Sequence, residues 1–221
     1  GRTTMACRKY LGLILVFGAA RAEERPVVWI TWRAHAYAPA DFGGKVLPSP
    51  GSLVTAAVEV IKGGAPVSLD NETIYWYLDG AFLKGGEGVR RASFRPTREG
   101  LTGLSVQIPS LGAAVIRAVA IPVARPEAVI VAPFPQGNFS EAKIQLRAEP
   151  FFFNIRSPED LKFFWKVNGQ EPASMEDPGV LDVGLDAKAP NNFRLGVELR
   201  IQGPRGISEL AARFLDLKFV K

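Results

Sequence analysis

Residues 74–80 read IYWYLDG and residues 163–169 read FFWKVNG, and these two stretches decide the fold. Each stretch alternates between two faces, carries one central tryptophan and ends in Asp-Gly or Asn-Gly. Both residues of such a pair accept positive φ, so the pair is a strong short-range signal for a β-hairpin. Because the two hairpins lie about one small β-domain apart, they predict two copies of one β-module.

The rest of the chain supports two modules of similar length. Its 221 residues are enough for two domains of roughly 100 residues each, and 17 prolines and 22 glycines suit short strands joined by many turns. The spacing from Trp76 to the strand of Val106 is nearly the same as the spacing from Trp165 to the strand of Val197. Two sandwiches explain this repeat more simply than one barrel does. Prolines 122 and 126 flank the expected junction, which predicts modules over residues 23–124 and 125–221.

A single tryptophan on the third strand of a cysteine-free module resembles bacterial immunoglobulin-like and PKD-like domains. The pair Tyr75-Trp76 with Asp79-Gly80 is similar to the PKD motif, although the acidic Gly-Asp tract that follows the PKD tryptophan is absent. The resemblance implies an all-β fold of two tandem immunoglobulin-like β-sandwiches. In such a sandwich the tryptophan fills the space between the sheets.

A wider pattern resembles a second group of proteins. The segments 32–34 (WRA), 44–48 (GKVLP) and 152–154 (FFN) are similar to uncharacterised exported two-domain proteins of candidate-phylum bacteria. That resemblance implies an architecture and a location, and it implies no activity.

Residues 1–22 have the pattern of a signal peptide. Basic Arg8 and Lys9 precede an apolar run over residues 10–20, and Ala20-Arg21-Ala22 places small residues where signal peptidase cleaves. A buried strand or helix is the alternative for this run, and an uncut leader that anchors the chain is another. No later stretch approaches 18 apolar residues, so we expect no membrane span after the leader. The pattern predicts export, to the periplasm or to the cell surface and extracellular space.

Charge and cysteine content exclude two classes of protein. The formal net charge of +5 comes mostly from the leader, which holds Arg2, Arg8, Lys9 and Arg21 and no acidic residue. The remainder is nearly neutral, so we expect no nucleic-acid partner. The single cysteine, Cys7, lies inside the leader, which excludes a disulfide scaffold for the mature chain.

Few residues could carry chemistry, and none forms a catalytic pattern. His35 is the only histidine, too few for a His-rich metal site, and we expect it at a strand edge. The clusters 70–72 (DNE) and 176–177 (ED) could each give calcium two ligands, but solvated turns are the expectation. Residues 85–88 (GGEG) are expected in a hairpin loop and lack the Lys-Ser/Thr of a phosphate loop. We therefore predict no catalytic, cofactor-binding or metal-binding residue and no cofactor.

Two further clusters suggest contacts with partners. Arg90, Arg91, Arg95 and Arg98 form a basic stretch in which Arg91 and Arg95 would share one face of a strand. A solvated edge is the expectation, and an anionic glycan or an acidic partner surface is the alternative. The three rings of residues 151–153 (FFF) cannot all point inward on one strand. Either the neighbouring module or a partner covers one of them, or a bulge packs them in the core.

These observations predict a non-catalytic exported protein that acts as a structural or protein-interaction module of the bacterial envelope or surface. Its partner would be an envelope or surface protein. The alternative is a carbohydrate-binding module that grips a glycan with exposed aromatic rings, among them that of Phe152. An enzyme would instead require a convergent polar pocket near His35 or the acidic clusters.

Overall fold

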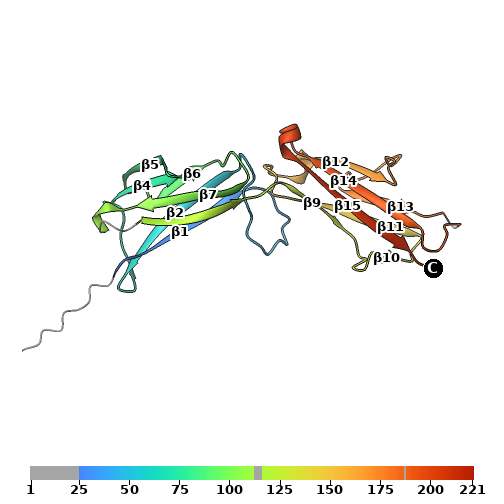
Figure 1. Cartoon of the computed structure of the whole chain (residues 1–221), viewed down its shortest axis with the longest axis horizontal. Coiled ribbons are helices and arrows are strands. Elements are labelled where there is room, and N and C mark those ends of the chain that lie inside the picture. The colour runs from blue at the N-terminus through green and yellow to red at the C-terminus, as the bar shows by residue number, and fades with distance from the viewer. Residues whose placement is uncertain (1–24, 112–115, 187) are drawn as a thin grey trace, which may run out of the picture.

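The computed structural model describes residues 25–111, 116–186 and 188–221. The predicted signal peptide, with Cys7, lies outside the described residues. Figure 1 shows two β-structures that follow one another along the longest axis, with the long loop between β1 and β2 beside their junction. We call the part from β1 to β8 module 1 and the part from β9 to β15 module 2.

The strands are short and alternate buried with exposed positions, as period-two patterning requires. Module 1 contains β1 (Val27–His35), β2 (Leu53–Lys62), β3 (Ala65–Pro66), β4 (Thr73–Leu78), β5 (Ala81–Glu87), β6 (Arg91–Phe94), β7 (Gly100–Gln107), the 3-10 helix η1 (Pro109–Leu111) and β8 (Ile116–Val123). Module 2 contains β9 (Glu127–Val131), β10 (Asn138–Phe139), β11 (Lys143–Phe151), η2 (Pro158–Asp160), β12 (Lys162–Val167), β13 (Val180–Gly184), β14 (Arg194–Gln202), η3 (Gly206–Glu209) and β15 (Leu210–Phe219).

Both modules have the strand order of an immunoglobulin-like sandwich. In module 1, β2 pairs with β1 on one side and with β6 and β3 on the other, and the second sheet has the order β5-β4-β7-β8. In module 2, the sheets are β9-β11-β13 and β10-β15-β14-β12. The early strands thus share a sheet with a middle strand, and the tryptophan strand shares the other sheet with the last two strands, of which it pairs with the first. This is the Greek-key arrangement of that fold. The predicted fold is confirmed.

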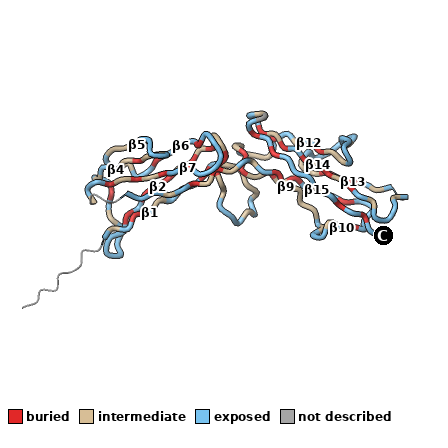
Figure 2. The backbone as a smooth tube through the Cα atoms, viewed as in Figure 1, coloured by how far each residue is buried: buried red, intermediate tan, exposed pale blue. Residues whose placement is uncertain are grey.

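Each module buries its own tryptophan in its own core. Trp76 on β4 is 0% exposed and Trp165 on β12 is 1% exposed, and they belong to separate clusters of buried side chains. Figure 2 shows buried segments along the strands of both modules. The indole Nε1 of Trp76 donates to the carbonyl of Val89 at 2.9 Å, and that of Trp165 donates to the carbonyl of Pro178 at 3.0 Å. Both polar atoms are therefore satisfied inside apolar surroundings.

The prediction of a loop over residues 85–88 is wrong for three of its four residues. Strand β5 continues through Gly85 and Gly86 to Glu87 and pairs with β4 along this length. The pairing register shifts by one residue between Trp76 and Tyr77, so β5 carries a bulge there. Gly85 fits in the strand because the ring of Tyr75 covers it and leaves no room for a side chain.

The connection between the modules is short. Strand β8 ends at Val123 and β9 begins at Glu127. The predicted division between residues 124 and 125 falls in this connection and stays a prediction.

Candidate functional site: an uncharged sheet face and the inter-module junction

Three aromatic rings cluster on the outer face of the sheet β5-β4-β7-β8. The ring of Phe82 lies 6.0 Å from that of Tyr77 and 6.5 Å from that of Tyr75, measured between centroids. The bulge in β5 places Phe82 directly opposite Tyr77, on the same face as Gly85. Phe82 is 63% exposed, so this cluster is open to solvent rather than part of the core.

The rest of this face is built from small and apolar residues. Leu101 is 69% exposed and Ile116 is 60% exposed, and glycine, alanine and serine lie between them and the rings. Thr73 and the charged Glu87, which pair at the far end of β4 and β5, border this region on the same side of the sheet. We call the other outward positions of this sheet the uncharged face: Tyr75, Tyr77, Phe82, Gly85, Leu101, Gly103, Ser105, Gln107, Ile116, Ala118, Ala120 and Pro122. None of them is Asp, Glu, Lys or Arg. The carboxylate of Asp79 lies at its border, where Oδ1 accepts a hydrogen bond from the Gly103 amide at 2.7 Å.

The corresponding face of module 2 carries many charges. Its two exposed rings, those of Phe164 and Phe214, are surrounded by ionised side chains and do not form a cluster with each other. The charged outward positions are Lys162, Lys166, Arg194, Glu198, Arg200, Asp216 and Lys218. A face rich in charges of both signs is typical of solvated protein surface, whereas an exposed apolar face marks an interaction site.

The loop between β1 and β2 joins the modules through backbone and rings. The Tyr37 amide donates to the carbonyl of Phe153 at 2.8 Å, and the Phe152 amide donates to the carbonyl of Tyr37 at 2.7 Å. The ring of Phe42 packs edge-on at 5.4 Å from that of Phe151 and 6.1 Å from that of Phe152. Phe153 is fully buried in module 2. The inter-module alternative for residues 151–153 is therefore confirmed.

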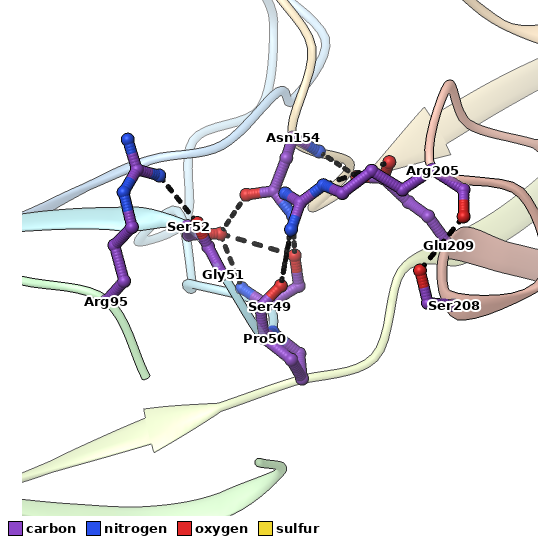
Figure 3. A network of polar contacts seen from close by, with 9 residues as sticks. All are labelled: Ser49, Pro50, Gly51, Ser52, Arg95, Asn154, Arg205, Ser208 and Glu209. Atoms are coloured by element: carbon purple, nitrogen blue, oxygen red, sulfur yellow. Dashed lines mark hydrogen bonds and ion pairs between the residues drawn. The ribbon is translucent and has the colours of Figure 1, made fainter. Parts of the chain in front are cut away.

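A polar network reinforces the same junction (Figure 3). The side chain of Asn154 accepts from the Ser52 hydroxyl at 2.5 Å and donates to the Ser49 hydroxyl at 2.9 Å and to the carbonyl of Pro50 at 3.3 Å. Both serines are buried. The two hydroxyls also lie 3.2 Å apart and bond each other, and the side-chain amide from module 2 adds a further buried partner for each of them.

Glu209 and Arg205 support Asn154 from the side of module 2. Glu209 is 2% exposed, and its Oε1 accepts a hydrogen bond from the backbone N–H of Asn154 at 2.5 Å. Its Oε2 has no hydrogen-bond partner in the described part of the chain and lies 3.8 Å from Arg205 Nε. The Arg205 guanidinium occupies the space that a side chain at Gly51 would need, and Gly51 has a φ of 83°. The two modules are thus held by interlocking groups rather than by a free linker.

A cavity of about 730 Å³ lies beside this loop, lined among others by Tyr37, Asp41, Glu149 and Phe163. Burial raises the pKa of the Tyr37 phenol, and the negative charges of Glu149 and Asp41 raise it further. The phenol therefore stays protonated at neutral pH.

The other predicted site residues lie apart from one another. His35 ends the edge strand β1, with Nε2 3.3 Å from the Thr55 hydroxyl. Asp70 pairs with Arg90 at 3.2 Å, Glu72 accepts from the Ser110 hydroxyl, and Asp177 Oδ1 accepts from the Gly179 amide at 2.8 Å. Within the described ranges, no group of three or more His, Cys, Asp or Glu residues is placed to hold a metal ion.

The basic stretch divides into a paired and an open part. Arg90 is bound to Asp70, whereas Arg91 on β6 and Arg95 just after it both point outward from the sheet. The expectation that Arg91 and Arg95 share a face is confirmed. Arg95 Nη1 also donates to the carbonyl of Gly51 at 2.6 Å, which ties it to the junction.

Comparisons with known proteins name no family for this chain. No protein-family model and no curated protein matches the chain. A similar solved structure holds three N-terminal domains of the bacteriophage RB49 highly immunogenic outer capsid protein Hoc, with 12% identity and a TM-score of 0.43. The match covers 88% of this chain and 59% of the Hoc fragment, so the chain spans less than two thirds of that length.

Two further solved structures are similar over most of the chain. The fibronectin(III)-like modules of Clostridium thermocellum CbhA are 14% identical over 88% of this chain and 94% of theirs, with a TM-score of 0.29. The full ectodomain of mouse nectin-like molecule 4 is 16% identical over 90% of this chain and 65% of its own, with a TM-score of 0.35. The immunoglobulin-like topology is established by the strand order of this chain itself. No helix in the described part of the chain is long and apolar enough to cross a bilayer.

Proposed function

We propose that this chain is a non-catalytic, exported interaction module of the bacterial envelope or cell surface. Its two modules, residues 23–124 and 125–221, form one stiff arm that presents the uncharged face of module 1 to a protein partner. The observation that carries the proposal is this face, which exposes aromatic and apolar side chains where module 2 exposes charges.

An uncharged face suits docking because few polar groups lose water when it is covered. Tyrosine and phenylalanine provide large contact area at low cost in side-chain entropy, and charged residues are depleted at the centres of protein interfaces. Four strands about 4.8 Å apart and four rows of outward residues give a face of roughly 20 by 20 Å, or about 400 Å². That is about half of the area that a standard interface buries on each partner, so the complex is expected to be transient.

The rings favour a protein over a neutral sugar as the ligand. Phe82 is inclined at 75° to Tyr77 and at 58° to Tyr75, so the three rings do not form the flat platform on which a sugar ring stacks. Phe152, the ring that the sequence suggested for a glycan, is 7% exposed and packs against Phe42. Phe152 therefore belongs to the junction, and its ring is not available to stack on a sugar as the carbohydrate alternative requires.

Export is supported by the order of basic, apolar and small residues in the first 22 positions. Mass spectrometry of the N-terminus of the native protein tests this part. We expect the mature chain to begin at Glu23. A native chain that retains residues 8–22 would contradict cleavage.

A charge placed on the uncharged face tests the docking proposal. Ala118→Arg puts an arginine at its centre, and Ala212→Arg puts one on the exposed face of β15 in module 2 as the matched control. We expect chemical cross-linking in the native envelope to capture a partner with the wild-type and Ala212→Arg proteins. Capture by Ala118→Arg should fall roughly tenfold, because an unpaired charge would be desolvated. Equal capture by both variants, or no captured partner, would overturn the proposal.

A further inference from the structure

Arginines gather in a cleft between the two modules, close to the side of module 1 that faces away from the uncharged face. The cleft has a volume of about 680 Å³ and is lined among others by Arg33, His35 and Arg95 of module 1 and by Arg156, Asp160 and Arg205 of module 2. Four guanidinium groups from four separate segments thus line the cleft with one carboxylate, that of Asp160, and the buried Glu209 carboxylate lies 3.8 Å from one of them, that of Arg205. This excess of positive charge is a property of the folded arm rather than of any stretch of sequence.

Two of the four guanidinium groups are held in place by backbone carbonyls. Arg95 Nη1 donates to Gly51 at 2.6 Å, and Arg205 Nη1 donates to Pro50 at 3.4 Å. Figure 3 shows that these two side chains approach the turn of residues 49–52 from different sides. Each keeps further N–H donors, because a guanidinium has five. Their positions are therefore set before any ligand arrives, which lowers the entropy cost of binding.

The other two arginines have no partner. Within the described residues, the side chains of Arg33 and Arg156 form neither a hydrogen bond nor an ion pair, and both are exposed. Elsewhere on the molecule, arginines such as Arg147 and Arg194 pair with a neighbouring carboxylate at 2.6 and 2.9 Å. Unpaired like charges in a cleft repel each other, and an anion placed between them relieves that repulsion.

The positive charge continues out of the cleft as a track. A second hollow of about 460 Å³ shares Arg33 and His35 with the cleft and runs over the outward face of β1, β2 and β6 to Arg91. Hydroxyl groups line it between the arginines, because Arg33 lies opposite Thr55, and Thr55 lies opposite Ser93. We call Arg91, Arg33, Arg95, Arg156 and Arg205 the arginine track. Its shape suits an extended chain rather than a single small anion.

We infer that the arginine track binds an acidic oligosaccharide whose charges are uronate carboxylates. Guanidinium groups bind carboxylates through two parallel hydrogen bonds. The hydroxyls of Thr31, Thr55 and Ser93 and the imidazole of His35 match the hydroxyl groups that a sugar chain carries between its carboxylates. This site is independent of the uncharged face, so either can fail without the other.

The test uses the full chain and a hexamer of galacturonic acid in isothermal titration calorimetry at low ionic strength. Arg33→Gln/Arg156→Gln removes the two unpaired guanidinium groups, which support no contact in the fold. Arg117→Gln/Arg213→Gln removes two exposed arginines outside the track and changes the net charge equally. Maltohexaose serves as the neutral sugar, and hexaglutamate serves as a peptide of the same charge. Circular dichroism verifies that both double variants fold.

We expect the galacturonate hexamer to bind, and its affinity to fall roughly tenfold or more in Arg33→Gln/Arg156→Gln but to stay within about twofold in the control. Maltohexaose should not bind, and added salt should weaken the interaction. Absence of galacturonate binding, or equal losses in both double variants, would overturn the site. Hexaglutamate that binds as tightly as the sugar would overturn the assignment to a glycan and identify an acidic peptide instead.

Discussion

The two modules are alike inside and different outside. In both, the indole donates to a carbonyl 13 positions further along the chain. In both, the turn after the tryptophan strand begins with a residue at positive φ, 48° for Asp79 and 49° for Asn168. The side-chain oxygen of each then accepts from a glycine amide of the neighbouring strand, Gly103 at 2.7 Å and Gly196 at 2.8 Å. These shared contacts define the fold and leave the outer faces free to differ.

The outer faces have diverged while the frame has stayed the same. Module 1 exposes rings and small residues on the sheet that contains its tryptophan strand, whereas module 2 exposes seven charged side chains on the equivalent sheet, as described above. Charged side chains keep a sheet face solvated and prevent association. The comparison teaches that one frame carries two unlike surfaces. The proposed function assigns docking to module 1 and the orientation of module 1 to module 2.

The largest expected effect comes from removing either tryptophan. Trp76→Ala and Trp165→Ala should each lower the free energy of unfolding of their own module by about 3–5 kcal/mol, because a large cavity replaces a fully buried ring. Hydrogen exchange measured by mass spectrometry over a urea series follows the two modules separately. Each variant should lower the protection of strands in its own module and leave strands of the other module nearly unchanged.

Exposed Trp29 provides the control for both substitutions. It is 54% exposed on edge strand β1, so Trp29→Ala should change stability by less than about 1 kcal/mol. If Trp76→Ala lowered the protection of β12 and β14 as much as that of β4 and β7, the two cores would not be independent.

The next effect concerns the junction that joins the modules. Asn154→Ala removes the hydrogen bonds to Ser49, Ser52 and Pro50, which should cost about 1–3 kcal/mol of inter-module stability. Both cores should remain intact. Small-angle X-ray scattering should show a broader distribution of inter-module distances. Asn71→Ala, an exposed asparagine in the turn before β4, should leave the scattering unchanged, and equal broadening in both variants would contradict the role of Asn154.

The interior of this fold could be predicted from the sequence because its signals are local. Alternation around Trp76 and Trp165, followed by Asp-Gly and Asn-Gly, specifies strand, face and turn within seven residues. The predicted loop at residues 85–88 was wrong because the ring that covers Gly85 comes from the neighbouring strand. A pairing register is set by the whole sheet, and no local pattern reveals it.

The surface sites are non-local, and the sequence showed only fragments of them. The uncharged face combines β4, β5, β7 and β8, and only register brings Ala118 beside Ser105 and Tyr77. Arg95 was noticed within a basic stretch. Its companions in the arginine track, such as Arg156 and Arg205, come from a different module, and no spacing rule connects them. The composition of the sequence did give one indication of the uncharged face, because few charged residues occur between Tyr75 and Phe82.

A smaller effect distinguishes two glycines that lie under aromatic rings. A Cβ on Gly85 would come within 2.5 Å of the Tyr75 ring, whereas one on Gly196 would lie 3.3 Å from the Phe214 ring. Gly85→Ala should therefore cost about 1–2 kcal/mol, and Gly196→Ala should stay within about 0.5 kcal/mol of wild type, because lower entropy of the unfolded chain offsets the tight contact. Urea denaturation measures both. Equal costs would mean that Tyr75 moves freely, and the uncharged face would then lack a fixed shape.

The smallest effect is expected where the modules are most alike, at their turns. Asp79→Asn and Asn168→Asp keep the Oδ1 acceptor for Gly103 and Gly196, and both residue types tolerate positive φ, so each exchange should change stability by less than about 0.5 kcal/mol. Asp79→Ala and Asn168→Ala should each cost about 1–2 kcal/mol, because they lose the hydrogen bond and strain the turn. Urea denaturation of the four variants measures the difference. A large loss in Asp79→Asn alone would show that the negative charge, rather than the acceptor oxygen, holds the turn of module 1. Partner capture by Asp79→Asn should equal or exceed that of wild type, because this substitution removes a charge from the border of the uncharged face and leaves its frame intact.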